Sequence, residues 1–430
     1  MTFKPVYIID GARTPFLKAR NAPGPFSASE LAVQTSRSLL LRQSFSASDL
    51  DEVIVGCASP STDETNIGRV VGLRIGTGYH VPAWTVMRNC ASGMQALDSA
   101  LTNIQTGRSH LVLAVGTDAL SHAPILFSDK MVNWLSQWNT AKKPIQKLHA
   151  IRTFRPAYLA PVIGLLKGLN DPVVGISMGQ TAENLAWKFG ITRQEMDAYS
   201  VRSHQRTIEA QNCKQFDEIT PIIDAQGNLY TDDDGVRRDS TPDKLAKLKA
   251  VFDRPSGNIT AGNSSQVSDG AAALIVASAE AVQKWGLQPI GKITDSQWAA
   301  LDPAQMGLGP VHASIPLLQR NGLRLQDPDL WEINEAFAAQ VLGCIRAFAS
   351  EEYCQEHFNT PAWGTLDQEK LNVDGGAIAI GHPVGASGAR IVLHLLHALR
   401  ARNLSKGVAT ICIGGGQGGA MLIETMKDEP

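Results

Sequence analysis

The sequence predicts a layered α/β fold with two similar halves and an inserted loop domain between them. Short runs of β-branched residues, at 6–10, 53–56 and 111–115, alternate with longer segments of helical period. That alternation is the pattern of a layered α/β fold. A chain of 430 residues is also long enough for two or three units.

A weak internal repeat supports the two halves. The stretch that starts at Cys90, CASGMQALDSALTNIQTGRSHLVLAVG, is similar to the stretch that starts at Gly385, GASGARIVLHLLHALRARNLSKGVATICIGGG. Each reads as a turn of small residues, a helix and a buried strand. The amides of each first helical turn are therefore free to face a ligand or a charged sulfur.

The sequence between the halves has a different character, with broken periodicity, Pro-containing turns and several short helices. We therefore expect an N-terminal half over 1–118, an inserted loop domain over 119–267, a return to the N-terminal half over 268–287 and a C-terminal half over 288–430.

Within the insertion, residues 130–170 carry no Asp or Glu. Apolar residues such as Trp134, Trp138 and Phe154 are interleaved with the cations Lys130, Lys142, Lys143, Lys147, Arg152, Arg155 and Lys167. Two interpretations stay open. The segment is either a solvated loop that packs its own aromatics, or a basic amphipathic surface for membrane lipid or a partner subunit.

The composition of the whole chain excludes several classes of function. Lys+Arg 39 against Asp+Glu 41 argues against an extended nucleic-acid surface. The six Cys include no CxxC pair, so we expect neither a disulfide framework nor a metal site. The chain opens on an apolar β-like run instead of a signal peptide, and no stretch is apolar for long enough to cross a bilayer. We therefore expect a cytoplasmic protein, peripheral to the membrane if the basic segment binds lipid.

Cys90 is the first candidate for chemistry. A β-like run, 82–87, leads to it, and Ala91, Ser92 and Gly93 let the chain bend into the next helix. At a helix N-terminus the dipole and free amides favour thiolate over thiol, as a nucleophile requires. A cysteine among small apolar residues is by itself more often part of a core.

His382 lies between Gly381 and Pro383, in a loop that can approach a substrate without side-chain obstruction. A histidine in that setting is a poor core residue and a good general base.

Cys412 ends a strand before Gly414, Gly415 and Gly416. The same glycine run resembles a phosphate loop, but the following residues continue as a strand, which disfavours a dinucleotide site.

Asn334 and Glu335 stand where an apolar strand meets a helix. Asn334 is the better site candidate, because an amide can hold a water for an oxyanion. Glu335 is interpreted more simply as a first-turn charge that stabilises the helix dipole.

Taken together these motifs resemble thiolases over nearly the whole chain. The matching stretches are RTPF at Arg13, NCASG around Cys90, MGQTAENLA from Met178, TAGNSSQVSDGAA from Thr260, MGLGPVHA from Met306, NEAFA from Asn334, GGAIAIGHPVGASGAR around His382 and CIGGGQGGAM from Cys412. The resemblance implies the five-layered αβαβα thiolase fold, a homodimer or homotetramer, and acyl transfer between an acyl-CoA and CoA. It implies no permanently bound cofactor, since CoA is a substrate.

The resemblance also implies a role for each residue. His382 would take the proton of Cys90, whose thiolate attacks the 3-oxo carbonyl, and Cys412, a thiol poised near neutrality, would act at the α-carbon. One oxyanion would be met by His382 with a water on Asn334, the other by the N–H groups of Cys90 and Gly414.

Substrate binding is assigned in the same way. Ser265 would hydrogen-bond the pantetheine, and Met178 and Phe337 would border the acyl group. An arginine for the CoA nucleotide falls at Arg237 or Arg238, and we favour Arg237.

The subclass predicted is a 3-ketoacyl-CoA thiolase of fatty-acid β-oxidation. Ser177 stands where short-chain enzymes commonly have His, and the basic insertion resembles that of the trifunctional-complex β subunit, which suggests a hydratase/dehydrogenase partner subunit. NEAF, where such subunits typically have HEAF, keeps an acetyl-CoA C-acetyltransferase open. A non-catalytic lipid-binding or assembly subunit and a ketoacyl-carrier-protein synthase are less favoured hypotheses.

Overall fold

The computed structural model describes residues 4–20 and 22–426. The chain forms two compact units: one runs to His122 and resumes at Asp171, and the other is Ala123–Asn170. The smaller unit therefore lies inside the expected insertion, while residues 171–267 belong to the larger unit. The wider boundaries of the inserted domain, 119–267, stay a prediction.

The larger unit is built on a ten-stranded sheet. Its N-terminal strands, in spatial order, are β1 (Val6–Arg13), β10 (Ser268–Ser278), β5 (Leu111–Ala119), β3 (Glu52–Gly56) and β4 (Ala83–Val86), with the short β2 (Leu17–Lys18) beside β10. Its C-terminal strands are β11 (Gly291–Ala300), β14 (Gln417–Thr425), β13 (Lys406–Ile413) and β12 (Leu330–Ile333). Among the described strands, the two sets are joined where β1 and β11 pair over three residues, Val6 to Ile8.

Alternating side chains show that each half buries both faces of its strands. Along β10, Ala272, Leu274 and Val276 face one apolar core, whereas Ala273 and Ile275 face another. On β14, Met421 and Ile423 enter the same core as Leu274, while Ala420 and Leu422 enter a third. One core is therefore shared by both sets of strands.

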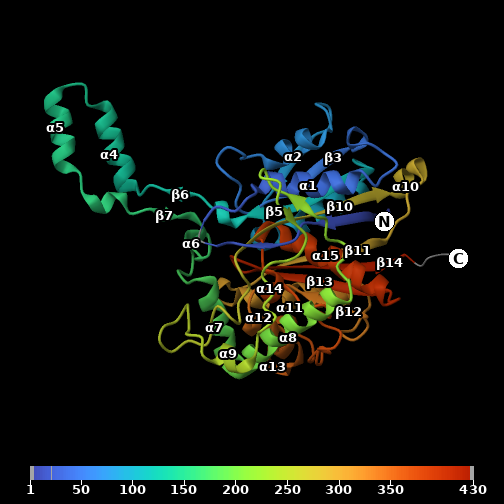
Figure 1. Cartoon of the computed structure of the whole chain (residues 1–430). Helices are drawn as coiled ribbons and strands as arrows, with labels where there is room; N and C mark the ends of the chain where they lie inside the picture. Colours follow the sequence, from blue (N-terminus) through green and yellow to red (C-terminus); the bar gives the residue numbers. More distant parts are fainter. Residues whose placement is uncertain (1–3, 21, 427–430) are drawn as a thin grey trace. The chain divides into compact units, whose positions relative to one another are not determined.

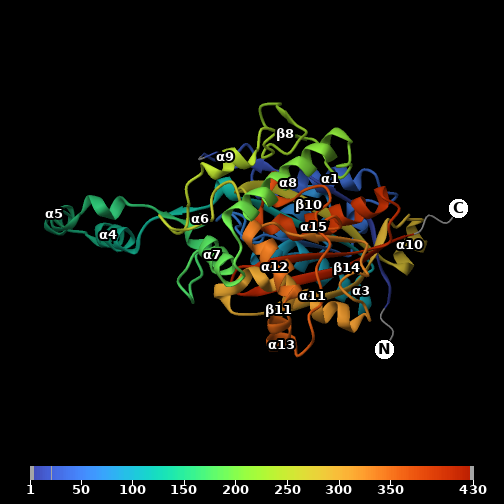
Figure 2. The same ribbon diagram turned by 90° about the horizontal axis from the view of Figure 1, so that it is seen from below.

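The shared core is filled by two helices, α3 (Ser92–Gln105) and α15 (Val384–Ala401), which pack on each other. The outer core of the N-terminal half lies under α1 (Ala28–Leu40) and α2 (Ile67–Ile75). The outer core of the C-terminal half includes α7 (Met178–Lys188), α11 (Gly309–Arg320) and α12 (Ala338–Ala349). Figures 1 and 2 show α15 among the strands and α11 beside α12. This is the five-layered αβαβα order, and the predicted fold class is confirmed.

The two central helices occupy equivalent positions in the halves. α3 is followed by β5, and α15 by β13, as the internal repeat predicts. In α3 the apolar residues Met94, Leu97, Leu101 and Ile104 are all buried. Their spacing of three and four residues keeps them on one helix face. The two helix N-termini lie together, because Gly93 approaches Gly385 and Gly388 approaches Met94.

The remaining elements of the larger unit are shorter or lie on its outside. They are α8 (Arg193–Asn212), β8 (Ile222–Ile223), β9 (Leu229–Tyr230), α9 (Pro242–Ala246), α10 (Ala279–Trp285), α13 (Glu351–Phe358) and α14 (Ala377–Ile380). Ser177 caps α7, because its hydroxyl accepts from the backbone N–H of Gln180. The serine that departs from the short-chain pattern therefore has a structural task at this helix start.

The smaller unit is a pair of helices with a few supporting elements. It contains β6 (Ile125–Leu126), α4 (Asp129–Thr140), α5 (Pro144–Thr153), β7 (Val162–Ile163) and α6 (Gly164–Gly168). Trp134 lies between the two helices: its ring centroid is 5.0 Å from that of Phe154 and 5.9 Å from that of Trp138. Its Nε1 donates to the carbonyl of Ala150 at 2.8 Å. The aromatics of the basic segment therefore pack on one another.

Candidate active site

The turn that carries Cys90 is rigid. Cys90 lies in a 3-10 turn, Asn89–Ala91, between β4 and α3. Asn89 has φ 43, and its side-chain amide donates to the carbonyl of Gly414 at 2.8 Å. Ser92 accepts from the N–H of Arg88 and donates to the carbonyl of Asn89. These bonds fix the cysteine at the start of α3 and tie it to the loop after β13.

Burial decides the charge of Cys90. Burial raises the pKa of the thiol, although the backbone N–H groups of Gly414 and of Cys90 itself face the sulfur and lower it. The nearby carboxylate of Asp118 raises the pKa further. The predicted position at a helix N-terminus is therefore present, but the free structure favours thiol over thiolate, because desolvation outweighs the backbone donors.

The hydrogen bonds of His382 define its tautomer. Its Nδ1 lies 2.6 Å from the hydroxyl of Ser387, and that hydroxyl donates its only hydrogen to the carbonyl of Pro383 at 3.0 Å. We assign the imidazole proton to Nδ1, since a hydroxyl that donates to Pro383 can only accept from the ring, and this assignment leaves a lone pair on Nε2. In the described part of the chain Nε2 is buried and has no hydrogen-bond partner.

His382 is also neutral in this site. Burial and the positive charge of Arg390 lower its pKa to about 4. The loop needs Gly381, which has φ 103 and where an added Cβ would lie 2.0 Å from the hydroxyl oxygen of Ser268. The geometry thus presents a neutral imidazole with a free, buried Nε2, as a general base requires.

Cys412 is completely buried near the end of β13. Burial raises its pKa well above the ordinary value, and the charges of Cys90 and Cys344 raise it further. The expectation of a thiol poised near neutrality is therefore wrong for this structure, since desolvation and a neighbouring thiolate both disfavour its ionisation. Cys412 remains an acid when Cys90 is charged.

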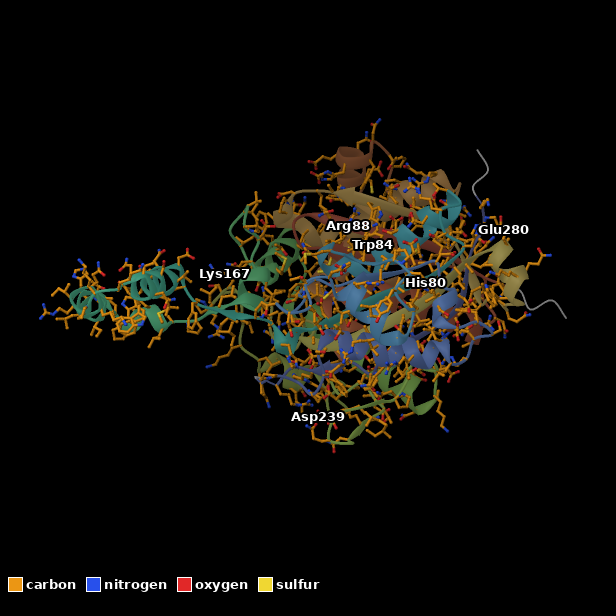
Figure 3. The ribbon with its side chains drawn as sticks, turned by 90° about the horizontal axis from the view of Figure 1, so that it is seen from above. His80, Trp84, Arg88, Lys167, Asp239 and Glu280 are labelled. Atoms are coloured by element: carbon orange, nitrogen blue, oxygen red, sulfur yellow. The ribbon has the colours of Figure 1, made fainter. Side chains whose placement is uncertain are left out.

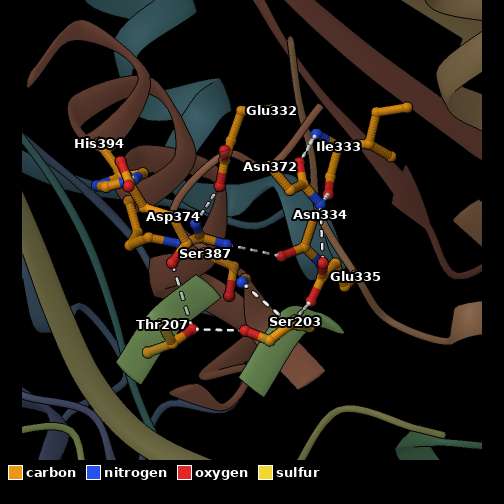
Figure 4. Close-up of polar contacts among 12 residues, drawn as sticks. Ser203, Thr207, Glu332, Ile333, Asn334, Glu335, Asn372, Asp374, Ser387 and His394 are labelled. Atoms are coloured by element: carbon orange, nitrogen blue, oxygen red, sulfur yellow. Dashed lines mark hydrogen bonds and ion pairs between the residues drawn. The ribbon is translucent and has the colours of Figure 1, made fainter. Parts of the chain in front are cut away.

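Asn334 follows β12 and is completely buried. The guanidinium of Arg390 donates to its side-chain oxygen at 3.4 Å, and Arg390 also pairs with Glu332 at 2.5 Å. Within residues 4–20 and 22–426 the Nδ2 of Asn334 has no partner. Figure 4 shows Glu332, Asn334 and Glu335 with their polar contacts.

Glu335 differs from its sequence interpretation. α12 begins at Ala338, so Glu335 is not in a first helical turn. It is 1% exposed, and its carboxylate accepts from Tyr199, Ser203, Asn372 and the backbone N–H of Ile378 (Figure 4). Glu335 thus holds α8 and the loop before α14 against the end of β12, which the sequence pattern did not reveal.

Three substrate-binding candidates lie around the same loops. A Cβ on Gly414 would be 3.2 Å from the sulfur of Met178, so the start of α7 touches the loop after β13. The N–H of Ser265 donates to the carbonyl of Ala336, next to Phe337. The Phe337 ring is 6.0 Å from that of Phe252, which packs on Gly179. Met178, Gly414, Ser265 and Phe337 therefore belong to connected loops.

Arg237 directly follows Val236, which packs against the apolar cluster that contains Ile380 and Ala386. Its backbone N–H donates to Nδ1 of His204 at 3.2 Å, and its charge lowers the pKa of His204 and of Lys18. The neighbouring carboxylate of Asp239 forms its ion pair with Lys244 and not with Arg237. Among the described residues no hydrogen bond joins Arg237 to Cys90 or His382.

Four residues that shape the site were missed by the sequence reasoning: Asn89, Arg390, Glu335 in its buried role and Ser387. Asn89 and Ser387 lie inside the motifs around Cys90 and His382, so their position was the available signal. Arg390 is the last residue of the motif around His382, but its position there did not indicate that it would point at Asn334.

The chain matches two family models that together cover most of its length. Residues 6–280 match "Thiolase, N-terminal domain" and residues 287–425 match "Thiolase, C-terminal domain". A 3-ketoacyl-CoA thiolase of Yersinia enterocolitica is 36% identical over 423 residues, which are 97% of this chain and 96% of that protein.

Solved structures agree with this match. Human mitochondrial 3-ketoacyl-CoA thiolase has a TM-score of 0.84 at 35% identity, covering 98% of this chain and 99% of its own. The same enzyme has been solved in complex with CoA. A Bacillus anthracis acetyl-CoA acetyltransferase also has a TM-score of 0.84 at 35% identity, covering 99% of both chains. The chain therefore belongs to the thiolase family.

Proposed function

We propose that this acyltransferase is a 3-ketoacyl-CoA thiolase of fatty-acid β-oxidation, which uses CoA to cleave a 3-oxoacyl-CoA into acetyl-CoA and a shortened acyl-CoA. The observation that carries the proposal is that the turn of Cys90, a thiol electrostatically coupled to Cys412, leads to Gly93, which lies against Gly385. That glycine is three residues after a neutral His382, whose Nε2 has no partner among the described residues. Relatives named 3-ketoacyl-CoA thiolase support the choice of substrate.

In the first step Nε2 of His382 takes the proton of Cys90, and the sulfur bonds to the C3 carbonyl carbon of the substrate. The C2–C3 bond then breaks, and its electron pair leaves as the enolate of acetyl-CoA. Cys412 protonates that enolate, because burial and the charge of Cys90 keep it in the thiol form. The acyl group stays on Cys90.

In the second step the thiol of CoA gives its proton to the thiolate that the first step left on Cys412, and attacks the acyl carbon on Cys90. Cys90 leaves as a thiolate and takes its proton back from Nε2 of His382, and shortened acyl-CoA is released. Such splitting of one difficult transfer into two easier ones is the gain from a covalent intermediate. CoA is thus a substrate, and the CoA complex of the human relative supports this use of the site.

The two oxyanions would be met by different donors. The N–H groups of Cys90 and Gly414 face the sulfur of Cys90, so they suit the tetrahedral carbon attached to it. His382 and a water on Asn334 would serve the enolate oxygen. One such donor is typically worth about 3 kcal/mol in the transition state.

Ser265 would hold the pantetheine, and Met178 and Phe337 would line the acyl group, because their loops adjoin the loop of Gly414. Arg237 would bind the nucleotide end of CoA.

The test is CoA-dependent thiolysis of 3-oxoacyl-CoA substrates from four to sixteen carbons, followed by loss of enolate absorbance. Activity that extends to long chains supports the proposal. Activity confined to acetoacetyl-CoA would select an acetyl-CoA C-acetyltransferase, which the Bacillus anthracis neighbour favours. No turnover by a protein that is folded and binds CoA would indicate a non-catalytic lipid-binding or assembly subunit.

The enzyme is further proposed to be a homodimer or homotetramer. β4 is an edge strand that pairs with β3 alone among the strands described, and an open edge can pair with another chain. Trp84 on this strand and Met87 just after it are exposed, and Figure 3 shows Trp84 near Arg88. Light scattering should give a dimer or larger assembly, and Trp84→Glu should shift it to monomer; a monomeric wild type would contradict the proposal.

The smaller unit is proposed to bind an anionic membrane surface. Its exposed apolar side chains include Ile125 at 72% and Ile145 at 69%, while its segment 130–170 has seven Lys and Arg and no acidic residue (Lys130, Lys142, Lys143, Lys147, Arg152, Arg155 and Lys167). Exposed apolar side chains can enter the acyl-chain region of a membrane, while the neighbouring cations contact the anionic headgroups. Among the described residues no helix has the length and apolar character of a membrane span.

Vesicle flotation tests this surface. We expect the protein to float with vesicles containing phosphatidylserine and not with neutral ones. K142Q/K143Q/K147Q should weaken vesicle binding about a hundredfold, because each cation near the surface contributes about 1 kcal/mol. K244Q, an exposed lysine of the larger unit, is the control. Unchanged flotation of the triple variant excludes the lipid surface; loss of binding to a purified hydratase/dehydrogenase subunit in the same variant would assign the surface to that partner.

The proposed compartment is the cytoplasm, with part of the protein at the membrane surface. All six cysteines are free, which suits a reducing compartment. Fractionation of cells should recover the protein in the cytosolic and membrane-associated fractions, and recovery in a secreted fraction would contradict this.

A further inference from the structure

Arg390 is a buried cation that the proposed reaction does not use directly. It lies in the middle of α15 and is 2% exposed. Its guanidinium pairs with Oε1 of Glu332 at 2.5 Å and donates to Oδ1 of Asn334 at 3.4 Å. Glu332 and Asn334 are two residues apart at the end of β12, so their side chains share one face of the strand (Figure 4).

This contact fixes which way the amide of Asn334 points. A guanidinium has donors and no acceptor, so only the carbonyl oxygen of the amide can face it. The N–H₂ group must then point away from Arg390. In the described part of the chain this Nδ2 is buried without a partner, as is Nε2 of His382. A buried donor without a partner is costly, and it is retained here at the proposed site.

We propose that Glu332 and Arg390 are positioning residues that orient the amide of Asn334, so that its N–H₂ group holds the water that serves the oxyanion of the acetyl-CoA enolate. Glu332 anchors the guanidinium, and the guanidinium holds Oδ1. The inference rests on the proposed function, because it assumes that Cys90 carries the acyl group.

The pair should matter for one part of the reaction only. The N–H groups of Cys90 and Gly414 face the Cys90 sulfur and serve the tetrahedral carbon bonded to it. Exchange of the acetyl group between acetyl-CoA and labelled CoA passes only through that carbon. Thiolysis of acetoacetyl-CoA and condensation of two acetyl-CoA molecules also pass through the enolate, where Asn334 acts.

The experiment compares both activities in Arg390→Lys and Glu332→Gln. Arg390→Lys keeps the charge but loses the planar fork; Glu332→Gln keeps the size but loses the anchor charge. Thiolysis kcat should fall about tenfold to a hundredfold, as for a misplaced donor. Acetyl exchange per folded molecule should stay within about twofold. Deuterium wash-in at the acetyl-CoA methyl group should fall with thiolysis.

Asp233→Asn is the matched control, since it removes a partner from Arg13, a cation equally buried and outside the site. Its thiolysis and exchange should change by the same factor. If either main variant does not fold, Glu332→Asp takes its place. It keeps the negative charge but moves it back by one methylene, and the same selective loss of thiolysis is expected.

Equal loss of thiolysis and exchange in the Arg390 and Glu332 variants, or no loss of thiolysis, would overturn the inference. Failure of the proposed function is a separate result, because wild-type protein would then lack both activities.

Discussion

At the scale of single residues, desolvation sets the charges of the two candidate thiols. Cys90 is only partly exposed and Cys412 is fully buried, and burial raises the pKa of each. The backbone donors at the start of α3 oppose this at Cys90 but do not reverse it. The proposed reaction therefore requires His382 to take the proton of Cys90 when the substrate is bound.

The rate at which iodoacetamide alkylates Cys90 should depend on pH through the raised pKa of its thiol. The pKa of the thiol lies above its ordinary 9.0, and His382 is neutral above about pH 5 because its pKa is about 4. The rate should therefore rise about tenfold per pH unit from neutrality to pH 9. Mass spectrometry measures the rate. The protein should carry Cys213→Ser, which removes the exposed competing thiol. A rate independent of pH over that range would indicate a thiolate–imidazolium pair instead.

Replacing Cys90 and replacing Cys412 should have different effects on the acyl-enzyme intermediate. Cys90→Ala should abolish both reaction directions, because no acyl carrier remains. Cys412→Ala should lower thiolysis about 10²- to 10⁴-fold, the usual loss for a general acid, yet still form acyl-enzyme. Labelled acyl-CoA and intact-protein mass measure this directly. A Cys412→Ala protein that takes up no label would contradict the division of roles.

At the scale of elements, the buried carboxylate of Glu335 connects β12, α8 and the loop before α14. Glu335→Gln presents N–H₂ to some of its four donors and should lower the free energy of unfolding by about 1–3 kcal/mol. Urea denaturation followed by tryptophan fluorescence gives the value. Glu369→Gln, at an exposed pair with Arg206, should change it by less than about 0.5 kcal/mol. Equal effects would show that Glu335 is not the connection we describe.

At the scale of the whole molecule, buried ion pairs join the N-terminal strands to α15. Arg13 of β1 contacts Glu218, and Glu218 contacts His394 at 3.0 Å. Burial alone would lower the pKa of His394, but Glu218 and Asp374 raise it to about 10. His394 is therefore a charged histidine that links distant parts of the chain.

The stability of the fold should depend on pH through this residue. The folded pKa lies above the ordinary 6.5, so the stabilising contribution is complete below about pH 6.5 and is lost as the pH rises towards about 10. Urea denaturation across that range should show a decline that His394→Gln lacks. The same slope in both proteins would mean that His394 is not the titrating group.

Much of the fold and of the candidate site could be predicted from local sequence. Strands at β1, β3 and β5, the helix after Cys90, and the strands on both sides of Gly414 follow from periodicity and turn residues. The motifs also marked Cys90, His382, Cys412 and Asn334, because glycines and small residues near a reactive side chain are themselves local features.

Only the tertiary structure decided how these residues are charged and oriented. Glu332 and Arg390 are 58 positions apart, and Arg13 and Asp233 are 220 apart. The tautomer of His382 depends on Ser387, the thiol state of Cys412 on burial between sheet and helices, and the direction of the Asn334 amide on Arg390. Desolvation and long-range contacts exist only after folding, so the sequence by itself determined the elements and the reactive groups, while packing determined their protonation and geometry.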